Sequence, residues 1–445
     1  MSVQTSGNWA ADTANIESSA ASATVATATV ATFAKSFVPF QFFGSTEIFV
    51  ASLLLCIASV AMNSRLHVTR AWEVKTELLL ITAFYALVVA NFLVVSGDDV
   101  PSTYLVGTVT FLPMFLALGF VTALRMKLLA WILLSASAIY VFFLSAFILT
   151  QGDVYQDGYF ADVFGLGRMV LLSGADTSQL YQNVGIYLAL GALSAAYLCA
   201  DLSSVIKKAL ISLSLCTAVA LTILVQARGA AAGLIFALLI RSRWYSRNIL
   251  GWTIIISVLA GLLLFVFADD LEHLPIWVRT INELSKADPP PNTRIAIYSF
   301  ALKAIWMDPA SFIFGRGFGM FPIDYGYRPP DWLLASPSAS LYPHNSILEA
   351  LYELGVVGAT LYAVSLAKPM IVGMNATKTK DAWLANSCFL MFVLMEMFSG
   401  ALAYSYPFVF FLGLLLGAIA DSRRQQLTVE INTKVPTALL RQLAL

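Results

Sequence analysis

The sequence predicts an all-α fold, a polytopic membrane helix bundle of 11–12 spans that carries a large, partly helical outer loop. Hydrophobic residues make up 59% of the 445 residues, charged residues only 12%, and the mean hydropathy is +0.79. Soluble domains carry about twice that share of charged residues. Apolar runs of about 20 residues, the length that crosses the hydrocarbon core, recur along the chain. Lys and Arg balance Asp and Glu at 26 each, so net charge gives no indication of a nucleic-acid partner.

Eleven apolar runs are candidate membrane spans, of which the seventh is short. They lie at residues 46–63, 77–96, 102–123, 128–150, 181–200, 209–226, 230–240, 249–268, 347–367, 383–402 and 405–420. A twelfth span could lie within 20–43, where apolar residues are mixed with Ala and Thr and are interrupted by Lys35.

Basic residues indicate the side of each connection, because short cytoplasmic loops are enriched in them. Fourteen of the 26 fall on alternate connections: Arg65, Arg70, Lys75, Arg125, Lys127, Lys207, Lys208, Arg241, Arg243, Arg247, Lys378, Lys380, Arg423 and Arg424. We therefore expect loops 151–180 and 269–346 to face outward and the C-terminus to be cytoplasmic. An even number of spans would put the N-terminus on the same side, which favours a span within 20–43.

This topology divides the chain into five parts. They are an Ala/Ser/Thr-rich, low-complexity N-terminal tail (1–36), the first part of the transmembrane bundle (37–268), the outer loop with an amphipathic helix (269–346), the last part of the bundle (347–420) and a cytoplasmic tail (421–445). The four cysteines lie inside apolar runs with no CxxC or Cys/His spacing, so the sequence gives no support for disulfides, a metal or another cofactor.

The outer loop contains the stretch PPPNTRIAIYSFALKAIW, which predicts a helix that begins after an N-cap at Thr293. Its apolar face would lie along the membrane interface. The residues of that predicted face are Ile295, Tyr298, Leu302 and Ile305. Arg294 falls in the first turn, where the helix dipole disfavours a cation. The position is favourable if an anion such as phosphate binds there, and the alternative is an arginine that reaches toward lipid headgroups.

Two further charged residues lie at or inside the predicted spans. Arg228, in VQARGAAAG, follows one span and precedes the next at the outer boundary, where an arginine marks a functional site or anchors the boundary. Glu396, in FVLMEMFSG, is either a packed carboxyl or a partner for an arginine. The run GRGFG around Arg316 predicts a turn with exposed backbone amides.

The stretch PHNSILEALYELG puts His344 directly before a predicted helix, on the water side of the boundary. Ser346 and Glu349 have the spacing of a capping box. A titratable group with a pKa near neutrality suits general-base catalysis there, although a lone loop histidine can equally be structural. Gly355 and Gly358 indicate close helix packing beneath it.

At these residues the chain resembles a known family. PHNSILEALYELGVVGATLY is similar to the signature of the O-antigen ligase and polymerase superfamily of bacterial inner-membrane glycosyltransferases. The upstream stretch TRIAIYSFALKAIWMDPASFIFGRGFGMF is similar to its companion block, and with the ARG at Ala227–Gly229 the likeness covers roughly 209–367.

The resemblance implies a multi-pass bundle of about twelve spans whose active site faces the periplasm, together with an activity. The donor would be a glycan linked through diphosphate to a polyprenyl lipid, and the partners would be this donor, a lipid or glycan acceptor and membrane lipids. Arg228 and Arg294 would hold the diphosphate, and His344 would help to deprotonate the acceptor hydroxyl. Arg316, Asn345 and Glu349 are candidates for supporting roles. The family's ligases are taken to invert the anomeric carbon without a metal.

Three functions fit this reading. One dominant outer loop favours an O-antigen ligase, which joins a finished glycan to lipid A core or a similar acceptor. The alternative in the same class is a polymerase of O-antigen or exopolysaccharide repeat units. A polysaccharide transporter or flippase would place coupling charges near the bilayer midplane, whereas the conspicuous arginines here are predicted at the outer boundary.

Overall fold

The computed structural model describes most of the predicted bundle. The described residues are 54, 64–96, 100, 102–151, 177–199, 228–239, 294–326, 342–376, 379–399, 402 and 405–434. The predicted spans at 209–226 and 249–268, the candidate span within 20–43 and nearly all of 46–63 lie outside them. The regular elements in the described part of the chain are all helical, so the predicted all-α polytopic membrane fold is confirmed.

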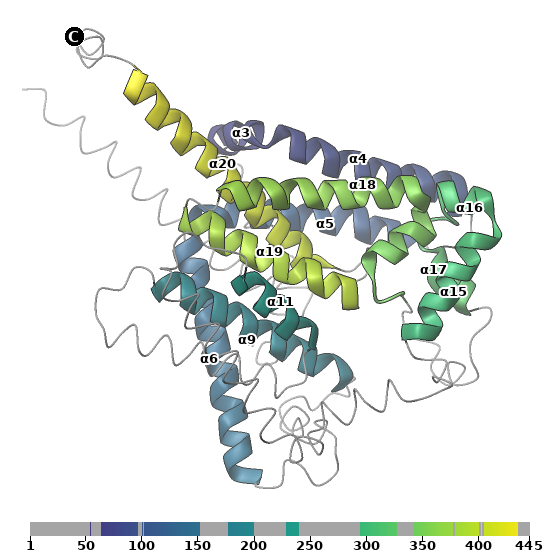
Figure 1. Cartoon of the computed structure of the whole chain (residues 1–445), viewed down its shortest axis with the longest axis horizontal. Helices are drawn as coiled ribbons and strands as arrows, with labels where there is room; N and C mark the ends of the chain where they lie inside the picture. Colours follow the sequence, from purple (N-terminus) through teal and green to yellow (C-terminus); the bar gives the residue numbers. More distant parts are fainter. Residues whose placement is uncertain are drawn as a thin grey trace, which may run out of the picture.

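The helices follow the predicted spans closely (Figure 1). In chain order they are α3 (Ser64–Glu73), α4 (Lys75–Asn91), the π-helix η2 (Phe92–Ser96), α5 (Ser102–Thr122), the 3₁₀ turn η4 (Ala123–Arg125), α6 (Met126–Gln151), α9 (Thr177–Cys199), α11 (Arg228–Leu239), α15 (Arg294–Met307), α16 (Pro309–Phe314), α17 (Met320–Gly326), α18 (Ser346–Ala376), α19 (Lys380–Ser399) and α20 (Tyr406–Lys434). Four stretches among the described residues are long and apolar enough to cross a membrane: Lys75–Ser96, Thr108–Phe142, Ser346–Ala376 and Tyr406–Leu427.

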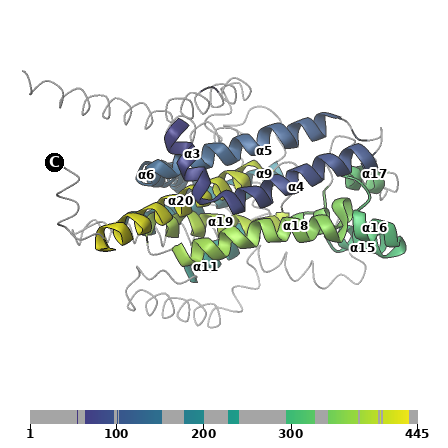
Figure 2. The ribbon, with the colours of Figure 1, turned by 90° about the horizontal axis from the view of Figure 1, so that it is seen from above.

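Helices α4, α5, α18 and α20 run along a shared direction, whereas α6 turns across it after η4 (Figures 1 and 2). The contact between α5 and α20 is a close approach of backbones. A Cβ atom at Gly119 would lie 1.9 Å from the carbonyl oxygen of Phe410, and one at Gly413 would lie 2.0 Å from that of Leu116. Glycines therefore let these two apolar helices pack at short range, as small residues do between helices in membranes.

A second, smaller apolar cluster lies outside the main core and joins α15 and α17 to the start of α18. Its members are Ile297, Ala301, Ile305, Phe321, Tyr325 and Tyr352. Helix α15 begins where the sequence predicts. On its predicted apolar face, Ile305 is buried in this cluster, Tyr298 is half-buried against it and Leu302 is 43% exposed. Ile297 and Ala301, which are not on the predicted face, are also buried in the cluster. The rings of Phe321 and Tyr352 select the stripe of α15 that is buried, and this partner is not visible in the local sequence.

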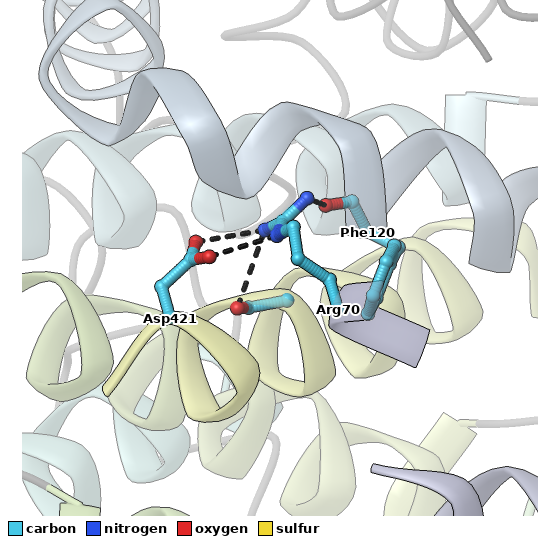
Figure 3. Close-up of polar contacts among 4 residues, drawn as sticks. Arg70, Phe120 and Asp421 are labelled. Carbon is cyan, nitrogen blue, oxygen red and sulfur yellow. Dashed lines mark hydrogen bonds and ion pairs between the residues drawn. The ribbon is translucent and has the colours of Figure 1, made fainter. Parts of the chain in front are cut away.

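The end of the bundle that carries α3 and the last turns of α20 is held by an ion pair between the buried Arg70 and the partly exposed Asp421 (Figure 3). The guanidinium group of Arg70, which is fully buried, donates from Nε and Nη2 to the two carboxylate oxygens of Asp421, each at 2.8 Å. It also donates to the carbonyl oxygens of Phe120 at 3.1 Å and Gly417 at 3.3 Å. Helices α3, α5 and α20 are thereby tied together, and α20 continues as helix into the predicted tail 421–445.

Helices α15, α16 and α17 lie at the opposite end of the bundle in both views (Figures 1 and 2). The described part of the predicted outer loop (294–326 and 342–346) and the basic end with Arg70 and Arg423 are therefore at opposite ends of the bundle. This end, with the start of α18, is called the outer end below.

Candidate functional site

His344 lies at the outer end, directly before α18, in an unusual backbone conformation. Its φ is +56°, and among the described residues it is the one non-glycine residue with a positive φ. L-residues rarely adopt this region, and such strain is concentrated at functional sites. The His344 ring is half-buried, with its centroid 4.3 Å from that of Tyr342, and Pro343 between them is buried. The prediction that His344 sits just outside a helix start is correct.

Asn345, not Ser346, caps α18. Its Oδ1 accepts a hydrogen bond from the backbone N–H of Leu348 at 3.0 Å. The predicted capping box is therefore wrong, because the buried carboxylate of Glu349 instead accepts from the backbone N–H of Leu402 at 3.0 Å. Asn and Ser are about equally good caps, so the Ser-x-x-Glu spacing favoured the wrong one of two adjacent candidates.

The amide nitrogen of the Asn345 side chain links α18 to α19. Its Nδ2 donates to the carbonyl oxygen of Met397 at 3.1 Å, in the last turn of α19, where carbonyl groups lack an intrahelical partner. Helix α11, which begins at Arg228, packs against the same stretch: a Cβ at Gly229 would lie 3.9 Å from Cγ of Met395. The backbone at Arg228 and that at His344 are thus both supported by the end of α19.

The Arg294 backbone belongs to the neighbouring part of the outer end. Arg294 begins α15, which packs through Ile297 and Ala301 on Tyr352 of α18. The side chains of Arg228 and Arg294 lie outside the described residues, so their contacts with His344 remain a prediction.

The glycine-rich run after α16 is a tight turn that packs on α18. Helix α18 is broken at Gly355, whose φ is +68°, and the backbone N–H groups of Arg316 and Gly317 donate to the carbonyl oxygens of Tyr352 at 2.9 Å and Glu353 at 3.0 Å. A Cβ at Gly355 would lie 2.2 Å from the carbonyl oxygen of Ile313. The close packing predicted at Gly355 is correct, but the partners are the end of α16 and this turn, and the two amides are hydrogen-bonded rather than exposed.

Arg316 is held in a network that the sequence did not reveal. Its Nε donates to Asp324 at 2.9 Å, and the same carboxylate oxygen accepts from the Tyr352 hydroxyl at 2.6 Å. The guanidinium carbon also lies 5.9 Å from the centroid of the Tyr352 ring. This pairing favours a structural role for Arg316.

Three buried carboxyl groups surround the start of α18. Besides Glu349, they are Glu353, whose Oε1 accepts from the backbone N–H of Phe321 at 3.3 Å, and Glu396, which accepts from the Ser405 hydroxyl at 2.7 Å. The packed-carboxyl interpretation of Glu396 is supported by this contact. Glu353 was missed by sequence reasoning, although its spacing of four residues from Glu349 puts both acids on one helix face. In the part of the chain that the structure describes, no three His, Cys, Asp or Glu side chains form a group that could hold a metal.

Comparison with known proteins bears on the same region. Residues 210–363 match the model of a family described as O-Antigen ligase, and this confirms the resemblance to the O-antigen ligase superfamily. No curated protein matches the chain. The matched segment contains α15, α16, α17 and the first part of α18, which form the outer end, together with α11.

Proposed function

We propose that the chain transfers a glycan from a polyprenyl diphosphate to an acceptor hydroxyl, a function that the match of residues 210–363 to the family described as O-Antigen ligase supports. Transfer would occur on the periplasmic side of a bacterial inner membrane. The observation that carries this assignment is the arrangement at the end of α19: His344, in a strained conformation, and the helix start at Arg228 share one support.

The chemistry divides among three residues. His344 accepts the proton of the acceptor hydroxyl as the oxygen forms a bond to the anomeric carbon, and a sugar hydroxyl needs such help because its pKa is far above 7. The bond between the anomeric carbon and the diphosphate oxygen breaks, and the bonding electrons leave with the diphosphate. Arg228 and Arg294 stabilise this anion at the membrane surface, where a lipid-linked diphosphate must lie. A single displacement of this kind inverts the anomeric carbon, and the two guanidinium groups supply the positive charge that a metal would otherwise bring.

The ligase is our first candidate among the reactions open to this site. The segment 269–346 would act as the periplasmic domain that receives the acceptor, and α15, α16 and α17 supply a folded surface for it. Lipid A core or a comparable lipid-borne glycan is the acceptor that we propose, with a growing repeat-unit chain as the polymerase alternative.

Purified protein with a defined polyprenyl diphosphate-linked glycan and a candidate acceptor tests the assignment. We expect a new glycosidic bond, detected by mass spectrometry, and release of polyprenyl diphosphate. Movement of the donor across proteoliposome membranes without bond formation would show a transporter and overturn the proposal.

Deletion of the gene separates the two transfer reactions. Loss of a ligase leaves full-length glycan on the polyprenyl lipid, whereas loss of a polymerase leaves single repeat units. Accumulation of single repeats would therefore replace the ligase assignment by the polymerase.

A further inference from the structure

We propose that Asn345 is a positioning residue for the transfer reaction, which fixes the spacing between His344 and the Arg228 helix start. The inference rests on the proposed function, in which His344 is the base. It assigns to Asn345 a task that neither capping alone nor contact with substrate would give it.

Both polar atoms of the Asn345 side chain are used, and they face different helices. Oδ1 accepts from Leu348 N–H within α18 at 3.0 Å, and Nδ2 donates to the Met397 carbonyl of α19 at 3.1 Å. A cap needs an acceptor only, and Asp and Ser satisfy that need as well as Asn. The donor group is what distinguishes Asn, and it is the donor that reaches α19.

The last turn of α19 acts as a common support. Met395 lies against Gly229, the residue after Arg228, and Met397 binds Asn345, the residue after His344. Two residues of a single helical turn therefore set the distance between the backbone of Arg228, the proposed diphosphate-binding residue, and that of His344, the proposed base. The connection after α19 is held to α18 a second time, where Leu402 N–H donates to Glu349.

The backbone of His344 depends on its neighbours. A residue with a φ of +56° keeps this conformation only where the surrounding contacts impose it, and His344 lies between the buried Pro343 and the doubly bonded Asn345. Loss of the Met397 bond frees one side of this arrangement, so the imidazole shifts relative to the donor while α18 remains capped.

Asn345→Asp tests this role because it keeps the cap acceptor and removes the donor. We expect kcat to fall roughly tenfold to hundredfold while KM for the lipid-linked donor changes less than about threefold, since misplacement of a base impairs the chemical step more than binding. If Asn345→Asp does not fold, Asn345→Ser serves the same purpose, since its hydroxyl can cap but is too short to reach Met397.

A double substitution distinguishes positioning from general damage. In a His344→Ala background, Asn345→Asp should reduce the residual transfer rate no further, because a residue that acts through His344 has nothing left to position. Additive losses would overturn the inference. Asp308→Ala is the matched control, since Asp308 caps α16 at the same outer end with a bond to Ala310 N–H at 3.0 Å but has no link to α19.

The outcomes also separate this inference from the function on which it rests. If the unmodified protein neither binds nor transfers the donor, the proposed function fails. If it transfers normally and Asn345→Asp has the same kcat as Asp308→Ala, the function stands and the positioning role is refuted.

Discussion

The two ends of the bundle differ in the partners of their charged groups. At the end with α3, cations pair with acids of the same chain: Arg70 binds Asp421, and Arg423 binds Glu77 at 3.0 Å. At the outer end, the hydrogen bonds described for Glu349 and Glu353 come from backbone N–H groups.

The partners of a charged group indicate whether it holds the fold. A guanidinium group such as that of Arg70, with a carboxylate and two carbonyl oxygens around it, has no capacity left for a substrate. Arg316 pairs with Asp324 through Nε at 2.9 Å while its side chain is 35% exposed, so the outer end also contains a cation that contacts an acid of the same chain. Arg228 and Arg294, at the first residues of α11 and α15, are the cations that we propose for the ligand.

Replacement of His344 should have the largest effect on activity. His344→Ala removes the proposed base, and we expect transfer to fall about 10² to 10⁴-fold in the purified-protein assay, with the protein still folded and inserted in the membrane. The matched control is His67→Ala, at the other end, where a buried histidine lies beside Arg70. Near-normal transfer by His344→Ala would remove this residue from the mechanism and with it the contrast between the ends.

Replacement of Asp421 should have the largest effect on stability. Asp421→Ala leaves the fully buried Arg70 without its carboxylate, which typically costs about 3 to 5 kcal/mol. Denaturant unfolding in detergent measures the loss, with Gln425→Ala as an exposed control on the same helix. Transfer per folded molecule should not change. A stable variant would mean that the ion pair is dispensable.

Arg294→Lys tests whether Arg294, at the outer end, binds the diphosphate as we propose. A lysine keeps the charge but cannot reproduce the planar fork of a guanidinium group on a diphosphate, so we expect roughly a hundredfold loss of kcat/KM, or about 3 kcal/mol. Lys303→Ala removes an exposed cation from the same helix and should have no effect. Equal activity of both variants would argue against a phosphate contact at Arg294.

The smallest effect that we expect is on the pH dependence of stability, through His67 at the end with α3. Burial, and then the nearby charge of Arg70, lower the pKa of His67 from its ordinary value of 6.5. Below pH 6.5 the unfolded chain therefore takes up a proton before the folded chain does, and stability falls as the pH is lowered through this range. His67→Asn should flatten the change in thermal midpoint between about pH 8 and pH 5.5. An unchanged slope would show that His67 does not titrate in this way.

Local sequence patterns predicted the parts of this structure that depend on local chemistry. Apolar runs of membrane length located α4, α5, α6, α9, α18, α19 and α20, because the bilayer imposes that length whatever the tertiary contacts. The place of His344 before a helix followed from the same boundary. Which face of α15 is buried, and whether Asn345 or Ser346 is the cap, depended on partners from other segments.

Contacts between residues that are far apart in the sequence could not be predicted either, because they too depend on partners from other segments. Arg70 and Asp421 are 351 residues apart, and neither residue has a neighbour in sequence that identifies its partner. The link between Arg316, Asp324 and Tyr352 likewise exists only after the glycine turn folds onto α18.

Helix α18, which is broken at Gly355, contributes residues to both apolar clusters. Before the break, Tyr352 packs with Ile297 and Phe321 in the small outer cluster, although Ala350 and Leu354 already belong to the main core. After it, Ala359 and Tyr362 belong to the main core alone. The amides of Arg316 and Gly317 donate to the carbonyl groups of Tyr352 and Glu353, directly before the break. The surface of the small outer cluster can thus vary in sequence while the long apolar helices keep their packing.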